Sequence, residues 1–360
     1  MQRAFAELYQ AEVYPPMSHP SADPAVNAGV ARFFGVGVSK VERARILEIG
    51  CGTGHHLLSV ASCWPSAECV GLDVSRKYIA RAKNLARQAG LKNVSFNEGS
   101  ILEFEPEGEF DFIIAHGVFS WVSNEVKVGM MDFIGKRLSK DGIAVVSFNV
   151  VAGWRERMLV VEKVRAIQEA GGVDEMTALA VFKTVASDRE SEIVDDMLAK
   201  GEEVLACDDF GPMTDAWSLG AMLKLAELSD LRWLGDSVTG ARGDDAADEK
   251  CKTTFRSEMF CRSDLLLGES MPIPEQVDEN FKVPNFPKLN SWRLVCAREC
   301  LPLVDPKLKS CVFPFSQIKV LSAMDGSRSL MDLADYSKEV SPELDFLPWL
   351  KYVAERGFFS

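Results

Sequence analysis

The sequence Ile46-Leu47-Glu48-Ile49-Gly50-Cys51-Gly52-Thr53-Gly54 decides the fold of this 360-residue chain. An apolar run with one acid ends in three glycines at alternate positions, which is typical of a buried parallel strand and a loop that approaches another group closely. Residues 55–63 then have helical spacing, so the loop also opens a helix. A strand, a glycine loop and a helix N-terminus form a nucleotide cradle, because backbone N–H groups point outward there.

The residue at position 55 helps to decide which class of nucleotide the loop can bind. The dinucleotide fingerprint needs glycine at 50, 52 and 55, but residue 55 is His. No part of the chain reads as a phosphate-binding loop with a Gly-Lys-Ser/Thr ending. The pattern is instead Gly-x-Gly-x-Gly, with Glu48 just ahead of it.

Three further segments follow in order. Cys69-Val70-Gly71-Leu72-Asp73 is a short strand that ends in an acid 19 residues after Gly54, where a carboxylate can accept both ribose hydroxyls. A third strand and its loop are expected over 93–101, and a fourth strand over 110–116. With the glycine loop, they resemble the ordered motifs of class I S-adenosylmethionine-dependent methyltransferases. The alternative is an α/β domain with an unrelated glycine turn.

That resemblance implies an α/β fold, namely a doubly wound Rossmann-like methyltransferase domain, followed here by a mainly helical C-terminal domain. It also implies that S-adenosyl-L-methionine is the cofactor and that the residues at the ends of the first four strands line its site. Many relatives have Asp in place of Ser100, which removes one expected hydrogen bond to the adenine amino group. The implied cofactor-binding residues are Glu48, Gly50, Cys51, Gly52, Asp73, Val74, Ser100, Ile101, Ala115 and His116.

The composition is that of an ordinary globular protein, and two or three domains are expected at this length. Net charge is −13 without a dense basic stretch, so nucleic acid is not an expected partner. No apolar run reaches signal-peptide or membrane-span length. Nine irregularly spaced cysteines suit a reducing cytoplasm and match no zinc pattern, so no metal is expected and buried thiols are favoured.

Four parts of the chain are expected. Residues 1–45 are an N-terminal lid segment, in which Asp23 caps a helix that begins at Pro24. Residues 46–155 are the cofactor-binding core, and 156–270 a helical regulatory or substrate domain without strands. Residues 271–360 are a connector and a small helical or winged-helix-like tail. In the helical domain, apolar spacing predicts helices over 160–168, 176–185, 193–200 and 217–228.

A closer resemblance is carried by Ala115-His116-Gly117-Val118-Phe119-Ser120-Trp121-Val122, Ser147-Phe148-Asn149 and Gly153-Trp154. These segments are similar to methyltransferases with a methyltransferase regulatory domain, which include rickettsial outer-membrane protein lysine methyltransferases. The segments 14–19 and 32–35 resemble the same family, and 254–259 keeps a weaker similarity. The likeness is good over 14–157, weak to about 270 and vague beyond, so the acceptor does not carry over with it.

The acceptor side has four candidate catalytic residues. His116 ends the fourth strand, where it can orient the substrate or take a proton near neutral pH, although a structural His is the alternative. Tyr14 is a candidate lid residue, Trp121 (with Trp154) a candidate channel wall, and Asn149 a weaker candidate after the fifth strand. Core packing is the competing interpretation of each aromatic residue.

Three functions remain open from the sequence. The first is a protein methyltransferase, with lysine favoured as the acceptor. The second is a small-molecule methyltransferase, because one fold hosts many acceptors. The third is a regulatory protein that binds the cofactor without catalysis. The expected partners are S-adenosylmethionine and a protein substrate, whereas the oligomeric state cannot be inferred.

Overall fold

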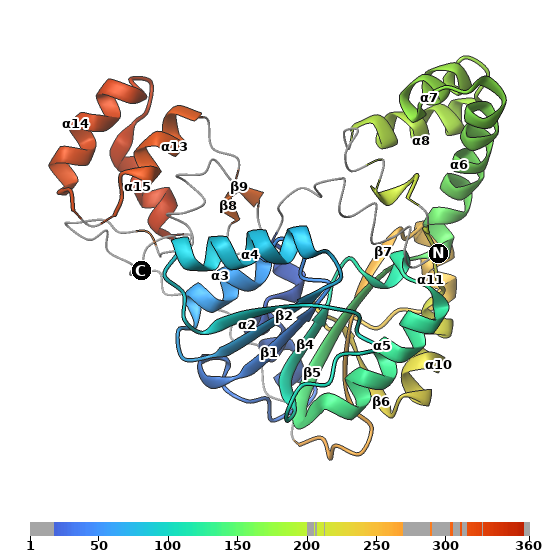
Figure 1. Cartoon of the computed structure of the whole chain (residues 1–360), viewed down its shortest axis with the longest axis horizontal. Helices are drawn as coiled ribbons and strands as arrows, with labels where there is room; N and C mark the ends of the chain where they lie inside the picture. The colour runs from blue at the N-terminus through green and yellow to red at the C-terminus, as the bar shows by residue number, and fades with distance from the viewer. Residues whose placement is uncertain are drawn as a thin grey trace.

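A computed structural model describes residues 18–199, 205, 207–211, 213–268, 289, 303–304, 310–311, 315–325 and 327–355. Its centre is a seven-stranded sheet with the order β3-β2-β1-β4-β5-β7-β6 (Figure 1). The strands are β1 (Arg45–Ile49), β2 (Glu68–Asp73), β3 (Val94–Glu98), β4 (Phe110–Ala115), β5 (Leu138–Asn149), β6 (Leu231–Asp236) and β7 (Phe255–Arg262).

The first five strands are parallel, whereas β7 is antiparallel to both β5 and β6. The strand order reverses between β1 and β4, which is where an open α/β sheet binds its ligand. Helices cover both faces, as expected for parallel strands that are buried on both sides. The doubly wound fold predicted from the glycine loop is therefore confirmed.

Two apolar layers hold these helices on the sheet. One face packs against α2 (Pro24–Phe33), α3 (His55–Cys63) and α4 (Arg76–Gln88). The opposite face packs against α5 (Asn124–Arg137) and α10 (Leu219–Leu228). The short helices η1 (Pro20–Ala22), η2 (Val41–Arg43), η3 (Phe119–Trp121) and α11 (Asp245–Cys251) complete this part. Asp23 caps α2 as predicted, with Oδ1 accepting from the Ala25 N–H at 2.8 Å.

A helical layer leaves the carboxyl edge of the sheet directly after β5. It consists of α6 (Val151–Gly171), α7 (Glu175–Lys183) and α8 (Asp188–Ala199), with an apolar core of its own (Figure 1). Arg157 of α6 binds Asp209 through two guanidinium N–H groups and Asp196 of α8 through a third at 2.5 Å. This buried cation therefore fixes α8 and the 207–211 segment against α6.

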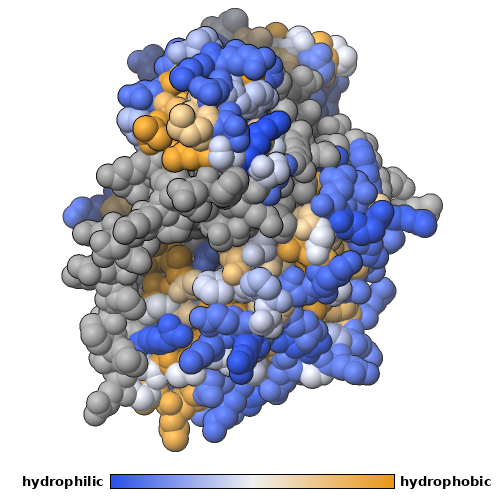
Figure 2. All heavy atoms as spheres, turned by 90° about the vertical axis from the view of Figure 1, so that its left-hand side faces the viewer, coloured by the Kyte–Doolittle hydropathy of each residue, from blue (hydrophilic) through white to orange (hydrophobic). Residues whose placement is uncertain are grey.

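The tail contains α13 (Phe315–Ser322), α14 (Leu330–Val340) and α15 (Phe346–Glu355), besides the short pair β8 (Leu303–Val304) and β9 (Ser310–Cys311). The face in Figure 2 is largely hydrophilic, with small apolar groups among polar residues. A helical tail agrees with the expectation, whereas its likeness to a winged helix and the division into four domains stay predictions.

The expectation that residues 156–270 contain no strands is wrong. Residues 231–236 and 255–262 are strands β6 and β7 of the central sheet. The interior of β7 is buried from Ser257 to Cys261, so it lacks the alternation of a half-buried strand. Arg256 and Glu258 interrupt its apolar run, so the sequence shows no strand pattern there.

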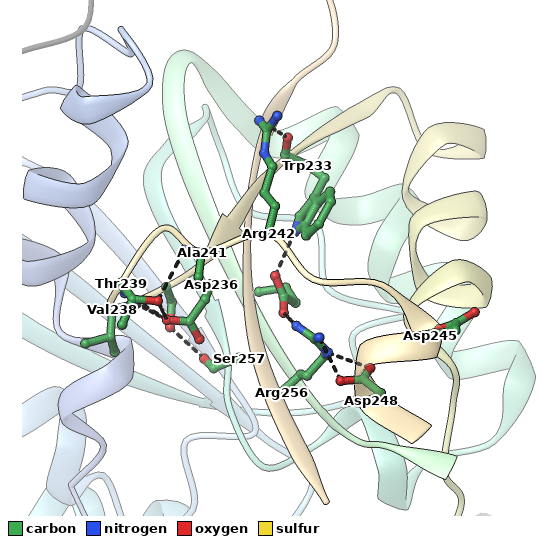
Figure 3. Close-up of polar contacts among 12 residues, drawn as sticks. Trp233, Asp236, Val238, Thr239, Ala241, Arg242, Asp245, Asp248, Arg256 and Ser257 are labelled. Carbon is green, nitrogen blue, oxygen red and sulfur yellow. Dashed lines mark hydrogen bonds and ion pairs between the residues drawn. The ribbon is translucent and has the colours of Figure 1, made fainter. Parts of the chain in front are cut away.

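Arg256, labelled in Figure 3, forms an ion pair with Glu258 at 2.7 Å. Arg256 donates to both carboxylate oxygens of Asp248 on α11, at 2.7 and 2.8 Å, and to Glu258 at 2.7 Å. The second oxygen of Glu258 accepts from the Trp233 indole N–H at 2.7 Å. Since the Glu258 side chain is fully buried, these bonds are what make its position in β7 tolerable.

Replacing Arg256 should destabilise the fold strongly. Arg256→Ala leaves Glu258 and Asp248 buried without their cation, which is expected to lower the free energy of unfolding by about 3 kcal/mol. Arg262→Ala is the matched control on the same strand, because its partner Asp264 is exposed, and it should lower that free energy by less than about 1 kcal/mol. Urea unfolding of both variants measures the difference, and equal losses would contradict the assigned role.

Glu48 is a second buried acid, in the middle of β1. Its side chain is 4% exposed, and burial, helped by the Asp73 carboxylate, raises the pKa of Glu48 to about 8 against a weaker opposing bond from the Leu57 N–H. The folded chain therefore keeps a proton on Glu48 that the unfolded chain releases above its ordinary pKa of 4.5. The contribution of Glu48 to folding stability therefore decreases as the pH rises from 4.5 to 8.

Glu48→Gln should remove this loss. We expect little difference from the unsubstituted chain near pH 5, and a variant that is more stable by about 1 kcal/mol or more near pH 8. Thermal unfolding across this pH range measures it, with Glu68→Gln at the exposed start of β2 as the control. Parallel curves for Glu48→Gln and the unsubstituted chain would show that Glu48 ionises normally.

Candidate functional site

The glycine loop joins β1 to α3 at the carboxyl edge of the sheet. The N–H groups of Gly50 and Cys51 both donate to the Leu72 carbonyl at the end of β2, at 2.7 and 3.0 Å. Gly50, Gly52 and Gly54 have φ values of +69°, +53° and +79°, which favour glycine over any residue with a side chain. The loop is thus fixed by backbone geometry and by the neighbouring strand.

The three glycines serve different purposes. A Cβ at Gly50 would lie 2.1 Å from the Val118 side chain, and a Cβ at Gly54 would lie 2.8 Å from the Phe96 ring. Both positions are therefore kept small by the protein itself. A Cβ at Gly52 would meet nothing within 4 Å, so this glycine borders open space. Of the three, Gly52 is where a ligand can lie directly on the backbone.

Asp73 ends β2 beside this loop. Its Oδ2 accepts from the Gly52 N–H at 2.9 Å and its Oδ1 accepts from the Ser75 N–H at 2.8 Å. Burial raises the pKa of Asp73, and these two N–H groups oppose that shift by stabilising the ionised form. The carboxylate therefore has a fixed orientation and retains lone pairs for a ribose diol.

Other predicted cofactor residues divide into exposed and buried ones. Val74 is 45% exposed next to Asp73, as a side chain that packs on an adenine ring would be. The Ser100 hydroxyl accepts from the Leu102 N–H at 3.3 Å, so it is engaged locally. Ile101, Cys51 and Ala115 are buried, and burial raises the pKa of the Cys51 thiol well above its usual value. Ala115 can therefore line the site only through its backbone.

His116 follows β4 and faces the N-terminal segment. Its ring lies 4.0 Å from the His19 ring and 5.5 Å from the Phe255 ring, measured between centroids. Burial holds the pKa of His116 well below 6.5, and the neighbouring His19 and His56 lower it further. His116 is therefore neutral at physiological pH. Of the two roles predicted for it, orienting a substrate by hydrogen bonding suits this ring better than taking a proton.

His56 attaches the N-terminal segment to α3. Its Nδ1 accepts from the Ser18 hydroxyl and the His19 N–H, both at 3.2 Å, so its Nε2 carries the hydrogen and donates to the Ala22 carbonyl at 3.2 Å. Burial lowers the pKa of His56 to about 3, which agrees with a neutral ring. His56 therefore attaches the N-terminal segment to α3 through three hydrogen bonds.

The remaining acceptor-side candidates are placed differently. Asn149 ends β5 close to His116, with a side chain that is 2% exposed. Trp121 donates its indole N–H to the Asp208 carbonyl at 3.4 Å, and Trp154 is buried in α6 under the Arg157 guanidinium. Packing therefore accounts for Trp154. Tyr14 lies outside the described residues.

Two residues of this site were not predicted as functional, His19 and Phe255. Phe255 is 41% exposed and opens β7, which sequence reasoning did not assign as a strand. The available signals were the family-like segments 14–19 and 254–259, which contain both residues. Their places in the site depend on contacts with His116, which is 97 residues from His19 and 139 residues from Phe255 in the sequence, and spacing along the chain does not show such contacts.

The part of the chain that the structure describes contains neither a candidate metal site nor a helix that could span a membrane. There, His, Cys, Asp and Glu side chains form no group of three or more that could hold a metal ion. Within the same residues, every helix is too short or too polar to cross a bilayer.

Comparison with known proteins agrees with this geometry. Residues 40–201 match the family model of a methyltransferase domain. An uncharacterised protein of Rickettsia prowazekii is 37% identical over 147 residues, or 41% of this chain and 59% of that protein. A second one from the same organism is 39% identical over 38% of this chain and 25% of its own length. The chain thus spans well under two thirds of these relatives.

The structure of PKMT2 from Rickettsia typhi in complex with AdoHcy has the same fold, with a TM-score of 0.77 at 17% identity, over 95% of this chain and 97% of that one. The malonyl-[acyl-carrier protein] O-methyltransferase 2 of Ilyobacter polytropus is 32% identical over 28% of this chain and 38% of its own length. The sheet order, the match of residues 40–201 to the methyltransferase-domain model and the structural similarity agree on the fold, which is that of a class I methyltransferase domain.

Proposed function

We propose that this chain is an S-adenosylmethionine-dependent methyltransferase that modifies a protein side chain, with lysine as the favoured acceptor. The observation that carries the cofactor assignment is the Asp73 carboxylate, which the Gly52 N–H holds at 2.9 Å beside the open side of the loop. This arrangement fits a nucleoside whose ribose hydroxyls bind Asp73 and whose adenine packs on Val74.

When bound, S-adenosylmethionine supplies an electrophilic methyl group: its carbon–sulfur bond breaks with the electron pair going to sulfur, while the acceptor's lone pair forms the new bond. The chain must hold the acceptor in line with that carbon and keep water away. The edge formed by His116, Asn149 and Phe255 is suited to this, because Asn149 is buried there and Val118, two residues after His116, packs on Gly50 of the glycine loop. An amine acceptor must also arrive uncharged, with its surplus proton given to water.

A polypeptide acceptor is favoured by the helical layer of α6, α7 and α8. This layer begins two residues after Asn149 and projects beyond the carboxyl edge of the sheet (Figure 1). It therefore offers a second surface next to the site, which a small acceptor would not require. The closer resemblance to rickettsial protein lysine methyltransferases supports the same interpretation.

A small-molecule methyltransferase is the second candidate. Malonyl-[acyl-carrier protein] O-methyltransferases and a trans-aconitate 2-methyltransferase are 27–34% identical to about 25–30% of this chain. These matches reflect the cofactor-binding core that the fold shares. They leave the acceptor of this chain to experiment.

Asp73→Ala should weaken binding of S-adenosylmethionine by at least about tenfold, because hydrogen bonds to a charged group contribute about 1.5–3 kcal/mol. Asp73→Asn keeps one acceptor oxygen and should show a smaller loss. Glu98→Ala removes an exposed carboxylate at the register partner of Asp73, so it should bind within about twofold of the unsubstituted chain. Calorimetry measures all three, and unchanged affinity in Asp73→Ala would refute the cofactor site.

The acceptor class can be tested by transfer of a radioactive methyl group. The full chain is incubated with labelled S-adenosylmethionine and an extract of the expression host, and protein is then separated from small molecules. We expect label in protein, on lysine after hydrolysis. Label confined to small molecules would support the second candidate, and no label in either fraction, despite cofactor binding, would indicate a regulatory protein.

A further inference from the structure

Unpaired polar atoms gather where β4 and β5 end. His116 Nδ1 and Asn149 Nδ2 are both buried without a hydrogen-bond partner among the described residues. Such atoms are rare in folded proteins, because each loses its bonds to water without replacement. Two of them at the edge of the cofactor site indicate that a ligand completes their hydrogen bonds.

Hydrogen bonds hold the backbone of Asn149 in place, and its side-chain Nδ2 remains available to a ligand. Its N–H donates to the Ser120 hydroxyl at 2.8 Å, and its carbonyl accepts from the Trp217 N–H at 2.9 Å. Asn149 is also the register partner of Phe255 on β7, and directly opposed residues of an antiparallel pair share one face of the sheet. The Phe255 ring in turn contacts the His116 ring at 5.5 Å. The side chains of Asn149, Phe255 and His116 therefore line the same site.

His19 lies over that site. Its ring lies on the His116 ring at 4.0 Å and 31°, and His56 holds its backbone through the hydrogen bond to Nδ1. Its ring is neutral as well, since burial lowers the pKa of His19 to about 4. No carboxylate or cationic side chain is among the groups that shift His116, which are His19 and His56. The site thus offers neutral hydrogen-bonding groups and one aromatic wall.

We propose that His116, Asn149 and Phe255 form the acceptor subsite, that it takes a neutral amine at the end of an apolar chain, and that His19 fills it when no acceptor is bound. This inference rests on the proposed methyltransferase function. A neutral primary amine has two N–H groups that can donate hydrogen bonds. His116 Nδ1 can accept one of them, and the Asn149 amide oxygen can accept the other once the side-chain amide turns by 180°. The nitrogen lone pair is then left for the methyl carbon, and Phe255 packs on the chain that carries the amine.

The test follows binding, so it does not depend on turnover. The full chain with nitrogen-15-labelled histidines is saturated with S-adenosylhomocysteine and titrated with n-butylamine, which represents the end of a lysine side chain. We expect the His19 and His116 ring signals to move together, and the signal of His55, which bonds Thr53 in the loop, to stay in place. If neither His19 nor His116 responds, the proposal is wrong.

Two variants with opposite expected effects distinguish a specific change in the subsite from a general loss of folded structure. Asn149→Leu should raise the half-saturating n-butylamine concentration at least fivefold. His19→Ala removes the competing ring and should lower that concentration at least threefold. Asn97→Leu makes the same change on β3 and should have no effect. Weaker n-butylamine binding in His19→Ala would overturn the role of His19, since a competitor's removal cannot weaken binding.

n-Butyrate has the same number of carbons as the amine and serves as the matched probe. Tighter binding of n-butyrate than of n-butylamine at His116 would overturn the amine assignment. Failure of S-adenosylhomocysteine to bind, seen by calorimetry, would refute the proposed function instead. The titration of the free chain would then still decide whether the subsite exists.

Discussion

One hydrogen bond, from the Gly52 N–H to the Asp73 carboxylate at 2.9 Å, joins the two strand ends on which the cofactor site depends. It requires a positive φ at Gly52, parallel neighbours β1 and β2, and a carboxyl group whose pKa is raised by burial and lowered by the N–H groups that bind it. The Ser75 N–H shares the carboxylate and begins the connection to α4, so the loop, the strand and the helix meet at a single group. The same arrangement places Val74, which lies between Asp73 and Ser75.

The parallel half of the fold could be predicted from the sequence because its signals are local. Glycines at alternate positions, an acid at a strand end and a capped helix each reflect the conformation of a few neighbouring residues. The same reasoning overstated the role of the glycines as a group, because Gly50 and Gly54 are excluded from carrying a side chain by Val118 and Phe96. Only contacts between distant segments distinguish these two from Gly52.

The antiparallel half could not be predicted because its signals depend on partners. Glu258 in the middle of a strand is acceptable only with Arg256 and Trp233 beside it, and Arg256 in turn needs Asp248. Without those contacts, a strand with two charged side chains in its interior is not expected. The acceptor side was affected for the same reason: Phe255 reaches His116 only because β7 pairs with β5. His19 reaches it only because His56 fixes the N-terminal segment.

The pairing of β5 with β7 also affects how the chain can fold. Asn149 and Phe255 are register partners although the whole helical layer and β6 lie between them in sequence, so this pairing closes a long loop and is intrinsically slow. During synthesis, the strands up to β5 are complete long before β7 leaves the ribosome. Until then β5 is an open sheet edge whose unpaired backbone groups can join a second chain. Fusions or truncations that end between β5 and β7 should therefore aggregate through this edge, whereas chains that include residue 262 can close it.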